Sequence, residues 1–193
     1  MLRTLLILLC FPRDNCCMED IRSLKALFWF SGKMDVLYEH LCRQYKTYIL
    51  LLLTYLAFSL RYEFAVNVSR SLPGTLYLIE KGDLPKRGEY VAFNYQSNFL
   101  YPQGTRFLKR VMGTAGDSVQ SRDHKFYVYG TFVGEAKPAT STGRPIRELG
   151  FNGVIPAGHY YVMADHSLSL DSRYEAVGLV SASQVIGKAF KLF

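Results

Sequence analysis

The sequence predicts a mostly β protein, with one antiparallel β domain behind a single N-terminal transmembrane helix. From Asn67 onward, short apolar stretches with period-2 alternation are separated by Gly, Pro, Asn and Asp, which is typical of antiparallel strands and hairpins. Tyr and Phe, which favour strands, supply nearly all of the 15% aromatic content. Upstream, residues 48–60 carry no charge and are apolar on every side, as expected of a membrane helix.

The expected strands are the apolar stretches of the C-terminal part of the chain. Turn-forming segments such as KGDLPKRG and TAGD separate these stretches, and no internal repeat or low-complexity tract interrupts the pattern. The strands are expected at 75–80, 89–95, 105–113, 125–130 and 159–165, with a closing strand within 180–193.

Three regions follow from this pattern. Residues 1–44 are predicted to be an N-terminal cytoplasmic segment, 45–66 the transmembrane anchor, and 67–193 a domain on the periplasmic or outer side. The uncharged run is 13 residues long, against the ~20 usually needed to span a bilayer, but its flanks can extend it. The basic residues Arg22, Lys25, Lys33, Arg43 and Lys46 precede the run, which favours a cytoplasmic N-terminus and a single-pass location in the bacterial inner (plasma) membrane. Two interpretations of the hydrophobic segment Leu2–Phe11 stay open. It is either a membrane-associated segment or an upstream extension of a protein that starts at Met34.

The distribution of charged residues and cysteines indicates which binding partners, metals and cofactors to expect. The net charge is +7, but the basic residues are scattered, so the charge indicates contact with membrane lipid and no nucleic acid. All four cysteines lie before residue 43, and their spacing matches no zinc pattern. We expect reduced thiols on the cytoplasmic side, and neither a metal nor another cofactor.

Two serines stand just after the predicted membrane helix. Ser69 and Ser71 lie two residues apart, so both project to the same side of an extended chain. Pro73 and Gly74 then force a turn, which presents Ser71 at the end of a constrained segment. By itself, this pattern is also that of an ordinary turn.

A lysine lies inside one of the predicted strands. Alternation places Phe107, Lys109 and Val111 on one face of the strand. A lysine on an apolar face is desolvated, which lowers its pKa and lets it act as a neutral base. The alternative is a lysine at the sheet edge that extends its amine into solvent.

The third segment, Val162–Tyr174, combines charged and hydroxyl side chains. Asp171 and Arg173 are two residues apart and can form a bidentate ion pair that fixes the loop. Ser169 and Ser172 supply hydroxyls that can orient a neighbouring amine.

Taken together and in this order, the three segments resemble the bacterial type I signal peptidase superfamily. Ser69 and Ser71 match its serine motif, the run from Phe107 to Gly113 its lysine motif, and the segment from Ser169 to Tyr174 its last motif. The Ser-Leu-Pro form followed by Gly74 and Tyr77 is most similar to the TraF-type peptidases of conjugative transfer. The chain departs from many relatives at Ala164-Asp165-His166, where those have Gly-Asp-Asn.

The resemblance implies a serine endopeptidase with a signal-peptidase-like β domain and a Ser–Lys dyad. Ser71 would be the nucleophile and Lys109 its general base, with Ser69 as an oxyanion donor. Ser169 would orient the lysine amine, and Asp171 paired with Arg173 would fix the loop. The implied substrate is an exported precursor protein, in the TraF-type branch a pilin precursor, whose leader or propeptide is removed. Some relatives in that branch circularise the pilin.

Three alternatives stay open at this stage. The first is a general signal peptidase that acts on many secretory preproteins. The second is a non-catalytic membrane scaffold of a secretion complex that retains the fold. The third is a Ser–His–Asp triad built from His166 with Asp165 or Asp171, which geometry and not sequence must decide.

Overall fold

A computed structural model describes residues 17–69, 71–140 and 142–193. The chain divides into two compact units, residues 1–55 and 56–193. Helix α1 (Cys17–Arg61) makes up the described part of the first unit and continues to the start of the second. The segment Leu2–Phe11, considered in the sequence analysis, lies outside the described residues, and so does Arg70 between the two serines.

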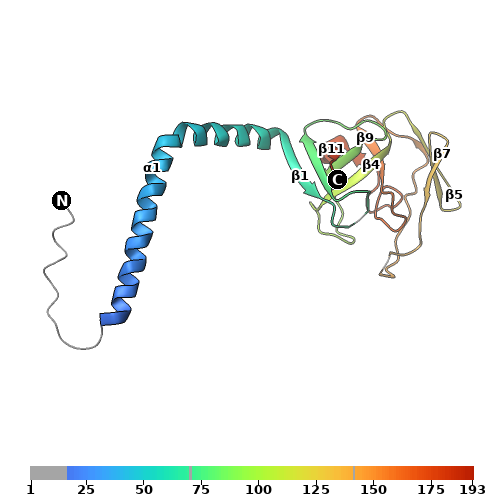
Figure 1. Cartoon of the computed structure of the whole chain (residues 1–193). Coiled ribbons are helices and arrows are strands. Elements are labelled where there is room, and N and C mark those ends of the chain that lie inside the picture. Colours follow the sequence, from blue (N-terminus) through green and yellow to red (C-terminus); the bar gives the residue numbers. More distant parts are fainter. Residues whose placement is uncertain (1–16, 70, 141) are drawn as a thin grey trace. The chain divides into compact units, whose positions relative to one another are not determined.

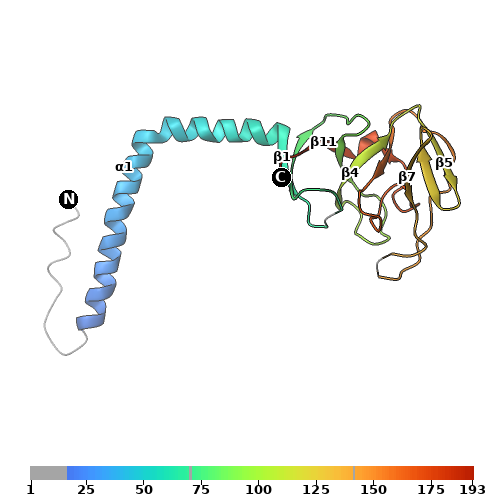
Figure 2. The same cartoon turned by 45° about the vertical axis from the view of Figure 1, so that its right-hand side comes forward.

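The second unit is built from two antiparallel sheets (Figure 1). The larger sheet has the strand order β1-β2-β11-β3-β4-β9-β10 and the smaller one β7-β6-β5-β8. In both views the labelled strands β5 and β7 lie at the side of the domain away from β1 (Figures 1 and 2). The bounds are β1 Tyr62–Val66, β2 Leu76–Lys81, β3 Tyr90–Asn94, β4 Arg106–Gly113, β5 Ser118–Arg122, β6 Lys125–Val128, β7 Thr131–Glu135, β8 Gly153–Val154, β9 His159–Met163, β10 Val180–Ser181 and β11 Val185–Lys191, with the 3-10 turn η1 at Ala182–Gln184.

The predicted mostly β fold is confirmed in this unit. Each expected strand is present as β2, β3, β4, β6 or β9, and the closing segment forms β10, η1 and β11. Alternation along β4 is visible in its burial, because Lys109 and Val111 are buried while Arg110 between them is exposed. Strands β5, β7 and β8 of the smaller sheet had not been predicted.

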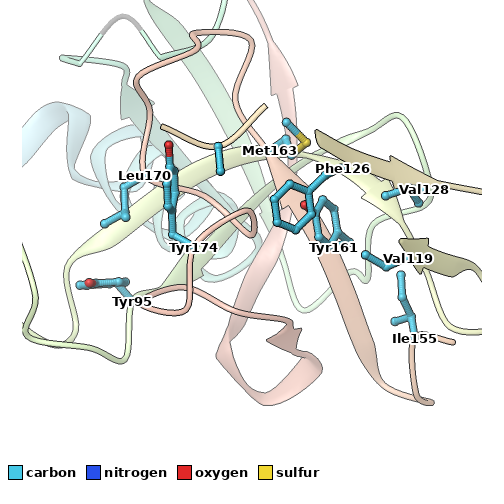
Figure 3. Close-up of a cluster of buried hydrophobic side chains, with 10 residues drawn as sticks. Tyr95, Val119, Phe126, Val128, Ile155, Tyr161, Met163, Leu170 and Tyr174 are labelled. Carbon is cyan, nitrogen blue, oxygen red and sulfur yellow. The ribbon is translucent and has the colours of Figure 1, made fainter. Parts of the chain in front are cut away.

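The core joins the two sheets. Side chains from β5, β6 and β9 pack with Leu170 and Tyr174 of the loop after β9 (Figure 3). Within this cluster the rings of Phe126 and Tyr161 lie 6.3 Å apart between centroids. Burial of large apolar side chains dominates the free energy of folding of such a domain, and here it also anchors the loop that carries the third motif.

The predicted transmembrane anchor at 45–66 is not found as predicted. The helix ends at Arg61, and 62–66 form β1, which pairs with β2 from Tyr62↔Glu80 to Val66↔Leu76. Tyr62, Phe64 and Val66, which are aromatic or β-branched residues at alternate positions, favour a strand here. Glu63 of this strand pairs with Arg106 of β4. None of the helices among the described residues is long and apolar enough to cross a membrane.

Candidate active site

The two serines of the first motif lie in the loop 67–75 that joins β1 to β2. The loop is closed at its base by a hydrogen bond from the Asn67 amide to the Thr75 carbonyl, 2.8 Å. Ser71 is 7% exposed, and its Oγ accepts a hydrogen bond from Ser69 Oγ at 3.0 Å. Next to it, Leu72 is buried among apolar side chains of the larger sheet. The position of Ser71 is therefore fixed by the buried side chain of Leu72 and by the hydrogen bond from Ser69 Oγ.

Lys109 is a buried amine on β4. Its side chain is 5% exposed, and Nζ donates a hydrogen bond to Ser169 Oγ at 2.6 Å. Burial lowers the pKa of Lys109 to about 8, with Asp171 acting in the opposite direction and Arg173 reinforcing the fall. A substantial fraction of this amine is therefore neutral near pH 8 and able to accept a proton.

The loop after β9 is fixed by a buried ion pair. Arg173 donates from Nε to Asp171 Oδ1 at 2.9 Å and from Nη2 to Asp171 Oδ2 at 2.8 Å, and both residues are at most 2% exposed. Arg173 also donates to the carbonyl of Glu135 in β7 and, at 3.3 Å, to the carbonyl of Ser169. The guanidinium therefore holds the backbone of the residue whose hydroxyl contacts Lys109.

The Ser172 hydroxyl does not orient the lysine amine, as the sequence had suggested it could. Its hydroxyl accepts a hydrogen bond from the Val162 amide at 3.0 Å, so it joins the loop to β9. The lysine amine is contacted by Ser169 and not by Ser172.

Ser69, Ser71, Lys109 and Ser169 line one cavity of about 440 Å³. Arg106–Lys109 of β4 also line the cavity, and in the described residues they pair with β3 on one edge but with no strand on the other, because β9 pairs with β4 only from Arg110 onward. Within the described part of the chain, no hydrogen bond joins Ser71 to Lys109. Such catalytic contacts are often long without substrate and shorten when it binds. The remaining lining is mainly apolar or aromatic and includes Leu100, Tyr101, Phe107, Leu108, Ile146, Leu168, Leu170 and Tyr174.

His166 also lines this cavity, but its contacts differ from those of a catalytic triad. Its Nδ1 lies 3.2 Å from the amide of Leu168, which donates to it, and its backbone amide donates to the Ser71 carbonyl at 3.3 Å. Both Asp171 oxygens are occupied by Arg173 and by nearby amides, and Asp165 is exposed. The geometry therefore favours Lys109 over His166 as the base. In the described residues, no group of three or more His, Cys, Asp or Glu side chains could hold a metal ion.

Comparison with known proteins places this arrangement in a family. The family model described as signal peptidase, peptidase S26, matches residues 41–193, which is well over half of the chain. The chain belongs to the signal peptidase family S26. The match covers the serine loop, β4 and the loop after β9, so all three segments of the cavity lie within the family's shared region.

Individual members of the family are similar at moderate identity. Signal peptidase I of Pseudomonas fluorescens is 29% identical over 150 residues, covering 60% of this chain and 51% of that protein. Signal peptidase I T of Bacillus subtilis (strain 168) is 32% identical over 117 residues, covering 56% of each. The crystal structure of a signal peptidase I from Enterococcus faecalis V583 matches with 28% identity and a TM-score of 0.37, over 55% of this chain and 97% of that one. The chain spans about half the length of the curated relatives it matches.

Sequence reasoning missed two residues that shape the serine loop. Asn67 and Tyr77 flank this loop and hydrogen-bond to its carbonyls. In the sequence they are an asparagine before a turn and an aromatic residue in a strand, and neither type signals such a contact. Only the burial of both side chains, at 8% and 0% exposed, distinguishes them.

Proposed function

We propose that this chain is a serine endopeptidase that removes a leader or propeptide from an exported protein by a Ser71–Lys109 dyad. The single observation that carries the proposal is the buried Lys109 amine, held by Ser169 in the cavity that also contains Ser71. A neutral amine among apolar side chains is a competent general base near pH 8, and a largely buried serine hydroxyl in the same cavity is a candidate nucleophile.

In the proposed reaction, neutral Lys109 takes the proton of Ser71 as Oγ attacks the scissile carbonyl. The C–O bond that forms gives a tetrahedral oxyanion, which Ser69 Oγ and the Ser71 amide would stabilise; one such donor contributes about 3 kcal/mol. The protonated Lys109 amine then donates its proton to the leaving amine as the peptide bond breaks. Water resolves the acyl-enzyme, unless an amine of the substrate replaces it and closes a ring.

The substrate is proposed to bind as an extended strand. Arg106–Lys109 of β4 line the cavity and have one backbone edge without a partner strand in the described residues, and such an edge can pair with an extended peptide. A leader that precedes a folded domain can adopt this extended conformation, so its cleavage site can reach the cavity.

A pilin precursor of a conjugation apparatus is the proposed substrate, on the strength of the Ser71-Leu-Pro segment with Gly74 and Tyr77. A general signal peptidase is the second candidate, favoured by the relatives named signal peptidase I. For either substrate class, the proposed location is the outer side of the bacterial inner membrane, where exported precursors emerge.

Processing of co-expressed precursors in membranes tests these proposals. Wild type, Ser71→Ala and Lys109→Ala are compared by mass spectrometry on a pilin precursor and on a secretory preprotein, with Ser121→Ala and Lys125→Ala in the smaller sheet as matched controls. The proposal expects a mass shift with wild type and both controls, and none with the two dyad variants. Processing by either dyad variant at the wild-type rate would overturn the dyad. The substrate that shifts identifies the class, and the product mass separates hydrolysis from ring closure, which differ by one water.

A further inference from the structure

The turn that follows Ser71 is held through its backbone carbonyls. The Ser71 carbonyl accepts a hydrogen bond from the amide of His166 at 3.3 Å. The Leu72 and Gly74 carbonyls accept from Asn67 Nδ2 at 2.8 and 3.0 Å. The Pro73 carbonyl accepts from the hydroxyl of Tyr77. All four consecutive carbonyls from Ser71 to Gly74 therefore have a donor, although this segment lies outside the ladder of β1 and β2.

This arrangement follows from the sequence of the turn. Pro73 has no amide hydrogen, and Gly74 has a φ of +101°, so the segment cannot continue either strand. Carbonyls that lose ladder partners must find others when they are buried. Two side chains, Asn67 and Tyr77, supply three of the four donors.

The carboxyl-terminal strand closes the other side of the turn. The Phe193 carbonyl accepts from the Thr75 amide at 2.7 Å, and the end of the chain lies beside β1 in both views (Figures 1 and 2). A Cβ atom on Gly74 would approach the Phe193 carbonyl oxygen to 2.4 Å, so the turn fits against this strand only with glycine.

Asn67 also reaches the second serine of the motif. Its Oδ1 lies 3.4 Å from Ser69 Oγ, while its Nδ2 is directed at the two carbonyls, which fixes the orientation of the amide. The single proton of the Ser69 hydroxyl can therefore be directed either to Ser71 Oγ at 3.0 Å or to Asn67. One side chain thus contacts both the turn after the nucleophile and the hydroxyl proposed to stabilise the oxyanion.

We propose that Asn67 and Tyr77 are positioning residues that clamp the Leu72–Gly74 turn and thereby aim Ser71 and Ser69 at the scissile carbonyl. The inference rests on the proposed function. A misplacement of the nucleophile by about 1 Å can cost about 100-fold in rate, so the clamp acts on the chemical step. Among the described residues, no hydrogen bond joins Asn67 or Tyr77 to Lys109, so their removal should leave the proton affinity of the base unchanged.

Steady-state cleavage by the full chain tests this inference. Tyr77→Phe removes only a hydroxyl, and Asn67→Ala removes both donors to the turn and the acceptor for Ser69 without adding a charge to the cavity. Each variant is expected to lower kcat about tenfold or more, with KM within twofold of wild type and an unchanged midpoint of the pH–rate profile.

Matched controls separate positioning from general loss of structure. Tyr161→Phe removes a buried hydroxyl that has no partner in the described structure, and Asn152→Ala removes an asparagine that bonds to an amide in the smaller sheet. Both should keep kcat within twofold. If Tyr77→Phe or Asn67→Ala lowers Tm but keeps the wild-type kcat per folded molecule, the clamp is structural only and the inference fails. Activity that survives Lys109→Ala would instead refute the proposed function, whatever the clamp variants do.

Discussion

Lys109 and Ser169 are 60 residues apart in sequence, yet the lysine Nζ donates a hydrogen bond to the serine Oγ at 2.6 Å. The contact joins β4 to the loop after β9, whose backbone at Ser169 is in turn held by Arg173. An amine buried in an apolar wall has several rotamers available to it, and a fixed acceptor selects one. The direction of the Lys109 amine is therefore a property of the loop as much as of the strand.

Ser169→Ala removes the acceptor of this hydrogen bond. We expect kcat of precursor cleavage to fall by about 10- to 100-fold, because a hydrogen bond to an amine that becomes charged contributes about 1.5–3 kcal/mol. Ser169→Thr keeps a hydroxyl and should retain more activity than Ser169→Ala. Equal kcat for wild type and Ser169→Ala, measured on the same precursor, would show that the contact does not aim the base.

The pKa of Lys109 predicts a pH dependence of cleavage. Burial lowers this pKa to about 8, and the amine must be neutral to accept the proton of Ser71. We therefore expect kcat/KM to rise with pH to a plateau, with a midpoint near 8, and Lys109→Arg to be inactive because arginine stays protonated. A profile of kcat/KM that is flat between pH 7 and 9 would contradict Lys109 as the base.

The sequence was sufficient to predict the strands that carry a strong apolar pattern. β3 and β9, with buried side chains at most positions, and β4, with clear alternation, all stand where the pattern placed them. β5 was missed because the segment SVQSR has one buried apolar residue, Val119, among polar ones. Such short, polar strands are formed by pairing within the smaller sheet, which no local pattern encodes.

The N-terminal boundary was predicted wrongly for a related reason. A run of apolar residues in 48–60 suggested an anchor that extends to 66, but the last five residues pair with β2. Residues 62–66 therefore take their structure from pairing with residues 10 to 18 positions further along the chain, and local apolarity could not reveal it.

The candidate active site also has residues that the local sequence indicates and residues whose roles depend on contacts formed only in the folded protein. Residue type and spacing singled out Ser71, Lys109 and the Asp171–Arg173 pair, but their roles came from the resemblance of the three segments to the signal peptidase superfamily. The structure brings Ser71 and Lys109 to one cavity. The roles of Asn67 and Tyr77 depend on carbonyls exposed by the Leu72–Gly74 turn, which only the folded loop specifies.

Breaking the buried Asp171–Arg173 ion pair should cost more stability than breaking an exposed ion pair. Asp171→Ala leaves the Arg173 guanidinium buried without its counter-charge, and we expect the free energy of unfolding to fall by about 3–5 kcal/mol. Lys137→Ala breaks an exposed pair with Glu135 and should cost no more than about 1 kcal/mol. Denaturant unfolding of both variants measures the difference. A loss below about 1 kcal/mol for Asp171→Ala would mean that Arg173 finds another partner or reaches solvent.

Lys109 also makes stability depend on pH in a defined window. The folded pKa is about 8, below the usual 10.5, so the unfolded chain binds the proton more tightly and stability from this group rises as pH increases from 8 to 10.5. The difference corresponds to about 3 kcal/mol. Lys109→Met has a similar shape and no charge, so we expect it to be more stable than wild type by up to that amount at pH 8.

This stability gap should close as the pH approaches 10.5, because the unfolded wild-type lysine then becomes neutral as well. Lys125→Met, on the exposed face of β6, is the matched control and should show no such closing of the gap. Unfolding by denaturant at a series of pH values gives both curves. A gap between Lys109→Met and wild type that stays constant from pH 8 to 10.5 would show that Lys109 titrates normally in the folded protein. The same result would remove the basis for treating Lys109 as a neutral amine at the pH of cleavage, independently of any substrate.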